Sequence, residues 1–169
     1  MTWERVLELA TEFNGKDLNG DGEPDFGFCF DGDYDTARTH LGMAASVLLY
    51  EKGKYQGYMY DLNPDDATPM TSVFNTPAYE YVLNMTRALW RQWDPAWDWG
   101  VPSLKVEDTF AQGRCALYFT WGGRTGVSRS DNKYNYTHGK LGVARMPGSK
   151  KVYDRKTRTL VECTNEICP

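Results

Sequence analysis

A short acidic segment near the start of the chain, residues 17–25, has the residue types and spacing of a calcium-binding loop. Gly22 stands at the sixth position, where such loops turn sharply, and the seventh position, Glu23, usually contributes its backbone carbonyl. Calcium takes six to eight hard oxygen ligands, and alternate residues of a tight loop point inward together. The spacing therefore predicts a structural calcium ion. Its expected ligands are Asp17, Asn19, Asp21, Glu23 and Asp25.

The twelfth position of this loop departs from the calcium pattern, because Phe28 stands where a bidentate glutamate is expected. A remote carboxylate, or one from Asp31, Asp33 or Asp35, must then complete the coordination shell. The alternative is a metal-free turn rich in Asn, Asp and Gly. If calcium binds, we expect it to tie the end of the first helix to the strand that begins at residue 26.

No familiar catalytic motif accompanies these carboxylates. The chain contains neither GxSxG nor HExxH, and the segment GGRTG at 122–126 lacks the GK[ST] of a phosphate-binding loop. The two histidines, His40 and His138, have no recognisable catalytic partners in the sequence. A pair of carboxylates acting on a glycoside stays open, because sequence does not reveal their separation. We predict a protein that is not an enzyme.

Charge and hydropathy exclude several classes of partner. The net charge is -4, whereas nucleic-acid binding calls for a basic surface. The basic run at 150–158 is typical of a solvated hairpin. No apolar stretch approaches the roughly 18 residues of a membrane span. Residues 1–4 open an amphipathic helix directly, so we expect no signal peptide in this stretch.

The four cysteines include no CxxC pair, which argues against a zinc knuckle or a thioredoxin-type site. An even number permits two disulfides in three connectivities. The sequons at 84–86 and 135–137 are typical of a secreted chain. We expect an oxidising compartment, with four buried thiols in a reducing one as the alternative.

Periodicity predicts the elements that must position these residues. Helices and strands alternate, which favours an α/β fold with a largely parallel or mixed sheet. The chain of 169 residues provides enough material for one ordinary domain. We expect helices over 3–13, 37–52, 76–93 and 104–112. We expect strands over 26–30, 115–121 and 140–146 and a hairpin over 152–161.

The order of these pieces resembles extracellular solute-binding proteins of ABC importers, of the sugar-binding type. The resemblance covers roughly residues 2–148, and it implies one lobe of the type II periplasmic-binding-protein-like fold, with helices packed on a mixed, mostly parallel sheet. The tail, 149–169, would add a hairpin and a cysteine-containing end, and it resembles solute-binding-like ectodomains of green-algal membrane proteins. The matching pieces are TWERVLELATEF, DLNGDGEPDFGF, the Thr-Pro helix start, FAQGRCALYFTW and LGVARMPG.

The resemblance also implies a function and a ligand site. Such proteins close two lobes over a small solute, so a companion lobe or other domains of a longer chain are expected partners. Trp121 follows the predicted strand and would stack on a sugar beside Gly122, while Arg124 would donate paired hydrogen bonds. Further candidates are Trp97, Asp98 and Trp99.

The expected function is therefore non-catalytic binding of a small solute, in particular a carbohydrate, outside the cell or in the periplasm. The alternative is a structural or protein-interaction ectodomain that has lost ligand binding. The high aromatic content, 24 side chains or 14% of the residues, suits either function, because it exceeds what a core of this size needs.

Overall fold

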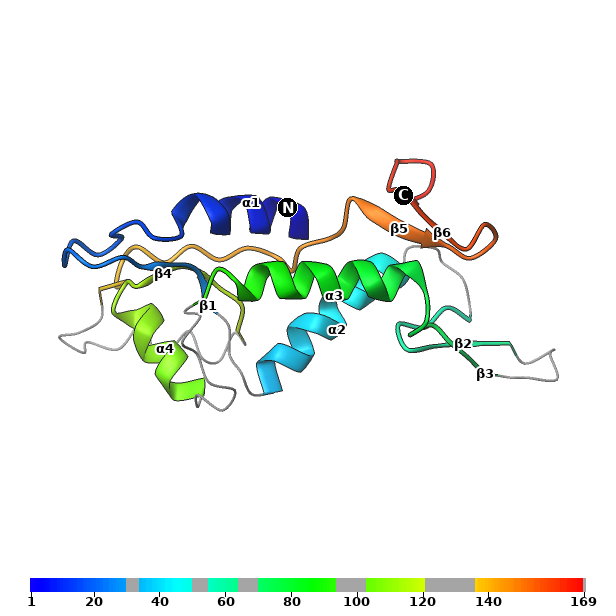
Figure 1. Cartoon of the computed structure of the whole chain (residues 1–169), viewed down its shortest axis with the longest axis horizontal. Coiled ribbons are helices and arrows are strands. Elements are labelled where there is room, and N and C mark those ends of the chain that lie inside the picture. Colours follow the sequence, from blue (N-terminus) through cyan, green and yellow to red (C-terminus); the bar gives the residue numbers. More distant parts are fainter. Residues whose placement is uncertain (30–33, 50–54, 64–69, 94–102, 121–135, 169) are drawn as a thin grey trace. The chain divides into compact units, whose positions relative to one another are not determined.

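The computed structural model has a mixed α/β fold (Figure 1). It describes residues 1–29, 34–49, 55–63, 70–93, 103–120 and 136–168. The helices are α1 (Trp3–Phe13), α2 (Tyr34–Leu48), α3 (Pro77–Trp90) and α4 (Ser103–Ala111). The strands are β1 (Phe26–Cys29), β2 (Tyr60–Leu62), β3 (Met70–Ser72), β4 (Cys115–Tyr118), β5 (Lys151–Asp154) and β6 (Thr159–Glu162).

The first helix forms where the sequence predicted it. The hydroxyl oxygen of Thr2 accepts a hydrogen bond from the backbone N–H of Arg5 at 3.4 Å, which supplies a weak N-cap. Trp3 and Ala10, on the apolar stripe, are buried. Gly15 ends the turn after the helix with φ +79°, a conformation that costs glycine little.

The third helix begins with Pro77 at its first position, where a missing N–H costs nothing. Thr76 precedes the helix, and its hydroxyl donates a hydrogen bond of 2.6 Å to the carbonyl of Val73. The contact anchors the helix start to the residue that follows β3.

The described strands form three two-stranded sheets, whereas we expected helices packed on a mixed, mostly parallel sheet. Among these described strands, only β1 and β4 pair in parallel, with Phe26 opposite Cys115 and Cys29 opposite Tyr118. The pairs β2–β3 and β5–β6 are antiparallel. The predicted C-terminal hairpin is confirmed as β5–β6.

One predicted strand is missing and several predicted boundaries differ. Strand β4 ends at Tyr118 and not at residue 121, and α3 ends at Trp90 and not at residue 93. Residues 141–147 contain no strand, and Val143 is 80% exposed. An apolar and polar alternation becomes a strand only where a partner strand pairs with it. Helix α2 covers 34–48 and not 37–52, so it begins three residues earlier and ends four residues earlier than predicted.

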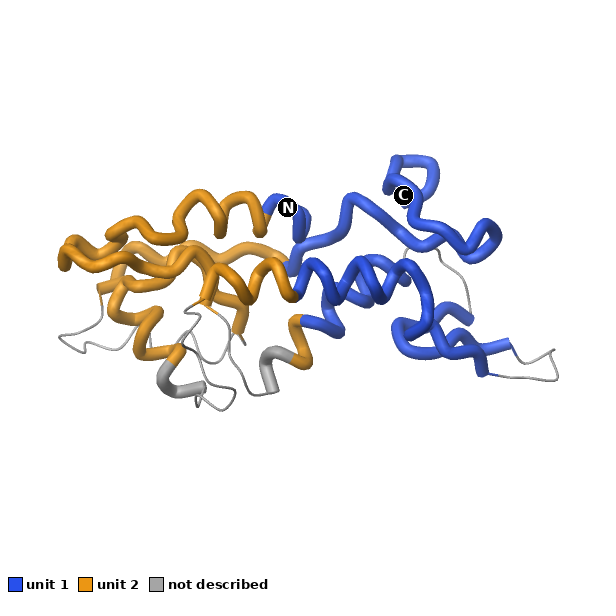
Figure 2. Tube along the Cα trace, viewed as in Figure 1, with its two compact units in different colours: residues 1–5, 40–86, 146–169 blue, residues 6–39, 87–145 orange. Residues whose placement is uncertain are grey.

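The described residues divide into two compact units, each of which is described by itself (Figure 2). Unit 1 contains residues 1–5, 40–86 and 146–169. Unit 2 contains residues 6–39 and 87–145. The boundary that we predicted after residue 148 stays a prediction. No helix within the described ranges has both the length and the hydrophobicity that a bilayer crossing demands.

Unit 2 has a core built around a disulfide between Cys29 of β1 and Cys115 of β4. Trp93 and Val106 are buried in the same cluster, and partly buried aromatic rings pack against it. Gly27 of β1 lies so close to α1 that a Cβ atom there would stand 1.7 Å from the Ala10 carbonyl oxygen. Only glycine permits this approach of helix and strand.

Unit 1 is joined by side chains that reach across segments distant in the sequence. Arg155, in the β5–β6 hairpin, binds both carboxylate oxygens of Asp61 at 2.7 Å. The same guanidinium donates to the carbonyls of Leu48 at 2.8 Å and Gly57 at 3.2 Å. A second disulfide, Cys163–Cys168, closes a short loop near the chain end.

A carboxylate makes a second junction in unit 1. Oε1 of Glu4 accepts hydrogen bonds from the Tyr81 hydroxyl, from the Lys150 backbone N–H at 3.0 Å and from the Ser149 hydroxyl at 3.4 Å. Burial raises the pKa of Glu4, but hydrogen bonds to its carboxylate, led by the one from Tyr81, outweigh burial and hold that pKa below its ordinary value. Burial and the bond to Glu4 raise the pKa of Tyr81.

Candidate functional site: the acidic loop

The acidic loop lies in unit 2 between α1 and β1, and two backbone hydrogen bonds close its base. The N–H of Gly15 donates to the Asp25 carbonyl at 2.8 Å, and the N–H of Asp25 donates to the Lys16 carbonyl at 3.0 Å. Gly20 and Gly22 adopt φ values of +83° and +89°. The turn at the sixth loop position therefore has the left-handed conformation for which glycine is suited.

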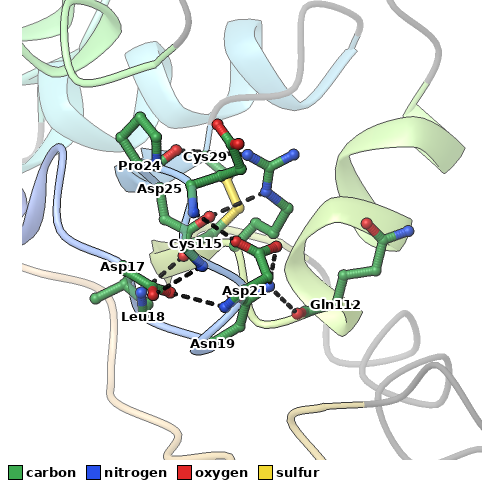
Figure 3. Close-up of polar contacts among 12 residues, drawn as sticks. Asp17, Leu18, Asn19, Asp21, Pro24, Asp25, Cys29, Gln112 and Cys115 are labelled. Carbon is green, nitrogen blue, oxygen red and sulfur yellow. Dashed lines mark hydrogen bonds and ion pairs between the residues drawn. A yellow bond between two sulfur atoms is a disulfide. The ribbon is translucent and has the colours of Figure 1, made fainter.

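Asp17 organises the first half of the loop (Figure 3). Its Oδ1 accepts hydrogen bonds from the backbone N–H groups of Gly20 at 2.6 Å and Asp21 at 3.2 Å. Its Oδ2 accepts one from Gly22 at 3.0 Å. A carboxylate at the first position thus gathers three backbone donors that would otherwise point into solvent.

Asn19 and Asp21 continue this arrangement. Asn19 Oδ1 accepts from the N–H of Asp21 at 3.0 Å, and Asp21 Oδ1 accepts from the N–H of Glu23 at 2.9 Å. The Asn19 amide also donates to Asp21 Oδ2 at 2.9 Å. The hydrogen bond from the Asn19 side-chain amide, followed by the one from the Glu23 N–H, lowers the pKa of Asp21, so its carboxylate stays ionised at neutral pH.

Asp25, at the ninth position, has a different environment from the other loop carboxylates. It is only 2% exposed, and its Oδ2 accepts a hydrogen bond from the N–H of Leu18 at 2.7 Å. Its Oδ1 pairs with Nε of Arg114 at 3.0 Å. The bond to Asp25 is the main reason that the pKa of Arg114 is raised. The guanidinium is therefore the counter-ion of the buried carboxylate.

The turn between α4 and β4 forms the other side of the site. The Asn19 amide donates to the Gln112 carbonyl at 3.2 Å, and Gly113, with φ +78°, follows directly. The carbonyl of Arg114 accepts the N–H of Phe26 at 3.0 Å. Sequence reasoning missed Gln112 and Arg114 as part of this site, because nothing in their local pattern places them beside a loop almost a hundred residues earlier.

These residues match calcium in donor type, because Asp17, Asn19 and Asp21 present hard oxygens at alternate positions of one tight loop. Both oxygens of Asp17, Asp21 and Asp25 accept hydrogen bonds from protein donors, and Asp25 differs from the other two in that it is buried and paired with Arg114. Throughout the described ranges, no group of three or more His, Cys, Asp or Glu side chains is arranged to hold a metal ion. Calcium binding stays a prediction.

The predicted sugar-binding residues lie outside the described residues, and their roles stay predictions. They are Trp97, Asp98, Trp99, Trp121, Gly122 and Arg124. The carboxylates suggested for completing the calcium shell, Asp31, Asp33 and Asp35, likewise lie where side chains are not described. Strand β4 is described to its end, and Phe119 and Thr120 then lead to Trp121.

Comparison of this chain with family models, with curated proteins and with solved structures finds no match. The resemblance to sugar-type solute-binding proteins therefore rests on the order of the sequence motifs quoted above. The fold family and function that it implies are proposals.

Proposed function

We propose that this chain is a non-catalytic module that binds a small solute, a carbohydrate, outside the cell or in the periplasm. The observation that carries the proposal is the parallel pairing of β1 with β4, because both strands then end at one edge of the sheet. Open α/β sheets bind ligands beyond the carboxyl ends of their parallel strands. In the sequence, Trp121 and Arg124 follow the end of β4 within six positions.

The proposed chemistry uses aromatic stacking with planar polar donors. The indole of Trp121 would cover the C–H face of a sugar ring, and the Arg124 guanidinium would donate to its hydroxyls. Trp97, Asp98 and Trp99 would supply further stacking and an acceptor. The lobe would belong to the periplasmic-binding-protein-like type, with a companion lobe closing over the solute.

The two disulfides support the proposed compartment. The disulfides Cys29–Cys115 and Cys163–Cys168 use all four cysteines of the chain, so none of them is a free thiol. Disulfides form and persist mainly in oxidising compartments. They are consistent with an extracellular or periplasmic protein.

Sugar binding is tested by calorimetric titration of the whole chain with a panel of neutral oligosaccharides. We expect saturable binding that Trp121→Ala weakens about fivefold or more, since an aromatic contact contributes about 1 kcal/mol beyond its buried area. Tyr55→Ala is the matched control, because this tyrosine is 49% exposed and lies in unit 1. Binding that Trp121→Ala leaves intact would remove Trp121 from the site.

The proposed calcium ion would be held by the side chains of Asp17, Asn19 and Asp21 and the Glu23 carbonyl, and it would supply only structural cross-linking. We expect the chelator EGTA to lower the melting temperature of the native chain and added calcium to restore it. The double variant Asp17→Asn, Asp21→Asn should abolish this calcium response. Glu12→Gln, an exposed change outside the loop, should keep it. A melting temperature unaffected by EGTA contradicts the proposal.

A protein-interaction ectodomain is the second candidate, and an exposed apolar surface on unit 1 favours it. This surface, the ribbon face, consists of Tyr60, Leu62, Met70 and Phe74, each at least 43% exposed. Solvent-exposed apolar patches often mark contact sites. A differential scanning fluorimetry screen against sugars and amino acids separates the candidates: saturable stabilisation favours solute binding, and its absence favours the interaction role.

A further inference from the structure

The ribbon face is unusual for an antiparallel pair of strands. Side chains alternate between the two faces of β2–β3, and Asp61 on the inner face is held by Arg155 while Val73, which continues that face, is 2% exposed. The opposite face would ordinarily be polar. Instead it carries Leu62 and Met70, directly opposite each other and 50% and 58% exposed.

The register shows which backbone groups point away from the pair. The N–H of Val73 donates to the Met59 carbonyl at 3.1 Å, so these residues form a hydrogen-bonded pair. Hydrogen-bonded and non-hydrogen-bonded pairs alternate along antiparallel strands, which makes Asp61 and Thr71 the next hydrogen-bonded pair. The N–H and C=O groups of Met70 and Ser72 therefore point to the outer edge of β3.

The two outer edges of the β2–β3 pair differ. On β2, the outward N–H of Leu62 donates to the Tyr55 carbonyl at 2.8 Å, so a preceding segment of the chain covers that edge. On β3, all three residues are exposed, and among the described residues no backbone group pairs with the outward groups of Met70 or Ser72. An uncovered strand edge is a template for another strand.

We propose that β3 pairs with β3 of a second copy of this chain, antiparallel about Thr71. Met70 of each copy would then lie opposite Ser72 of the other, and both would form hydrogen-bonded pairs through their outward N–H and C=O groups. Thr71 would face its own equivalent, a favourable cross-strand pair. The result is a symmetric four-stranded sheet in which the two ribbon faces become continuous.

Charge and the size of the contact are consistent with this occupant. Neither β3 nor the ribbon face carries an Asp, Glu, Lys, Arg or His that would repel a second copy. Pairing edge to edge adds backbone hydrogen bonds along the three residues of β3 and leaves the ribbon faces exposed, so the buried area stays below the roughly 1,200–2,000 Å² of stable complexes. The dimer is therefore weak and depends on concentration.

Sedimentation equilibrium of the whole chain over a wide concentration series tests the pairing. We expect the mean mass to rise from one chain toward two as concentration increases. Ser72→Pro, which removes an outward N–H, and Met70→Lys, which places like charges at the new junction, should both give a monomer at every concentration. Circular dichroism checks that each variant remains folded. If Ser72→Pro does not fold, Met70→Lys alone decides the question.

Leu83→Lys is the matched control, because Leu83 is an apolar residue of unit 1 that is 56% exposed on α3 and lies away from β3 in sequence. It should self-associate like the native chain. A native chain that is monomeric throughout overturns the proposal, as does self-association that Met70→Lys leaves unchanged or that Leu83→Lys weakens equally. None of these outcomes depends on the sugar site.

Discussion

The two units of this protein differ in the interactions that stabilise each of them internally. Unit 2 has a buried disulfide between residues 86 positions apart, and a carboxylate and guanidinium pair beside it. Unit 1 relies on two polar side chains, Arg155 and Glu4, that bind several segments at once, while its own disulfide spans only five positions. Because a disulfide stabilises more when it closes a longer loop, we expect one disulfide in each unit to contribute very unequally to the two.

The largest effect should come from the disulfide of unit 2. Replacing both of its cysteines, Cys29→Ala with Cys115→Ala, should cost about 4–5 kcal/mol of unfolding free energy, because the bond restricts a long loop in the unfolded chain. The pair Cys163→Ala with Cys168→Ala should cost only about 2 kcal/mol. Urea unfolding of both variants measures the difference. Equal losses would show that loop length does not govern these bonds.

The next largest effect should come from Arg155 in unit 1. Arg155→Met removes the paired bonds to Asp61 and both carbonyl contacts, and it leaves a largely buried carboxylate without its cation. We expect a loss of about 2–4 kcal/mol. Lys156→Met in the same hairpin is the control, because its exposed side chain should matter little. Similar losses for both variants would mean that the hairpin, not the guanidinium, is what the mutation disturbs.

A smaller effect is expected at Asp25, the buried carboxylate that pairs with Arg114. Asp25→Ala leaves the Leu18 N–H and Nε of Arg114 without their acceptor and should cost about 2 kcal/mol. Glu23→Ala, an exposed change in the same loop, should be nearly neutral. Both are measured by urea unfolding in EGTA, so that calcium does not contribute. If Asp25→Ala lowered the unfolding free energy as much as replacing Cys29 and Cys115, the expected order of these two effects would be wrong.

The smallest effect should be the acid sensitivity of unit 1 through Glu4. Because the pKa of Glu4 in the folded chain lies below its ordinary value, its contribution is present at neutral pH and is lost as the pH falls below about 4. Glu4→Gln should therefore lower the melting temperature at pH 7 and narrow the difference between neutral and acidic solutions. Thermal unfolding at several pH values measures this. An unchanged pH profile in the variant would exclude Glu4 as a source of acid sensitivity.

Sequence reasoning was most successful where short-range patterns decide the structure. Helix α1, the glycine turn of the acidic loop and strands β1 and β4 follow from periodicity, capping and glycine placement within a few residues. The fold class, mixed α/β, was predicted for the same reason. The disulfide pairing was not, because the residues allowed three connectivities and only the tertiary structure shows that Cys29 is bonded to Cys115, 86 positions later.

The errors arise where a distant residue decides the outcome. Helix α2 ends at Leu48, whose carbonyl accepts a hydrogen bond from Arg155 more than a hundred positions later. The predicted strand over 140–146 lacks a partner among the described residues, although its sequence alternates. At the acidic loop, the oxygen-bearing residues were recognised, but the role of Arg114 as counter-ion to Asp25 depends on a tertiary contact.

The close approach of Gly27 to α1 has a consequence for how this chain can vary. A side chain at position 27 would meet the Ala10 carbonyl, whereas at Gly142 a Cβ atom would meet no described atom within 4 Å. The first position tolerates no substitution without separating helix from strand, and the second tolerates many. Homologous sequences, wherever they have diverged, should therefore retain glycine at the first position long after the second has changed.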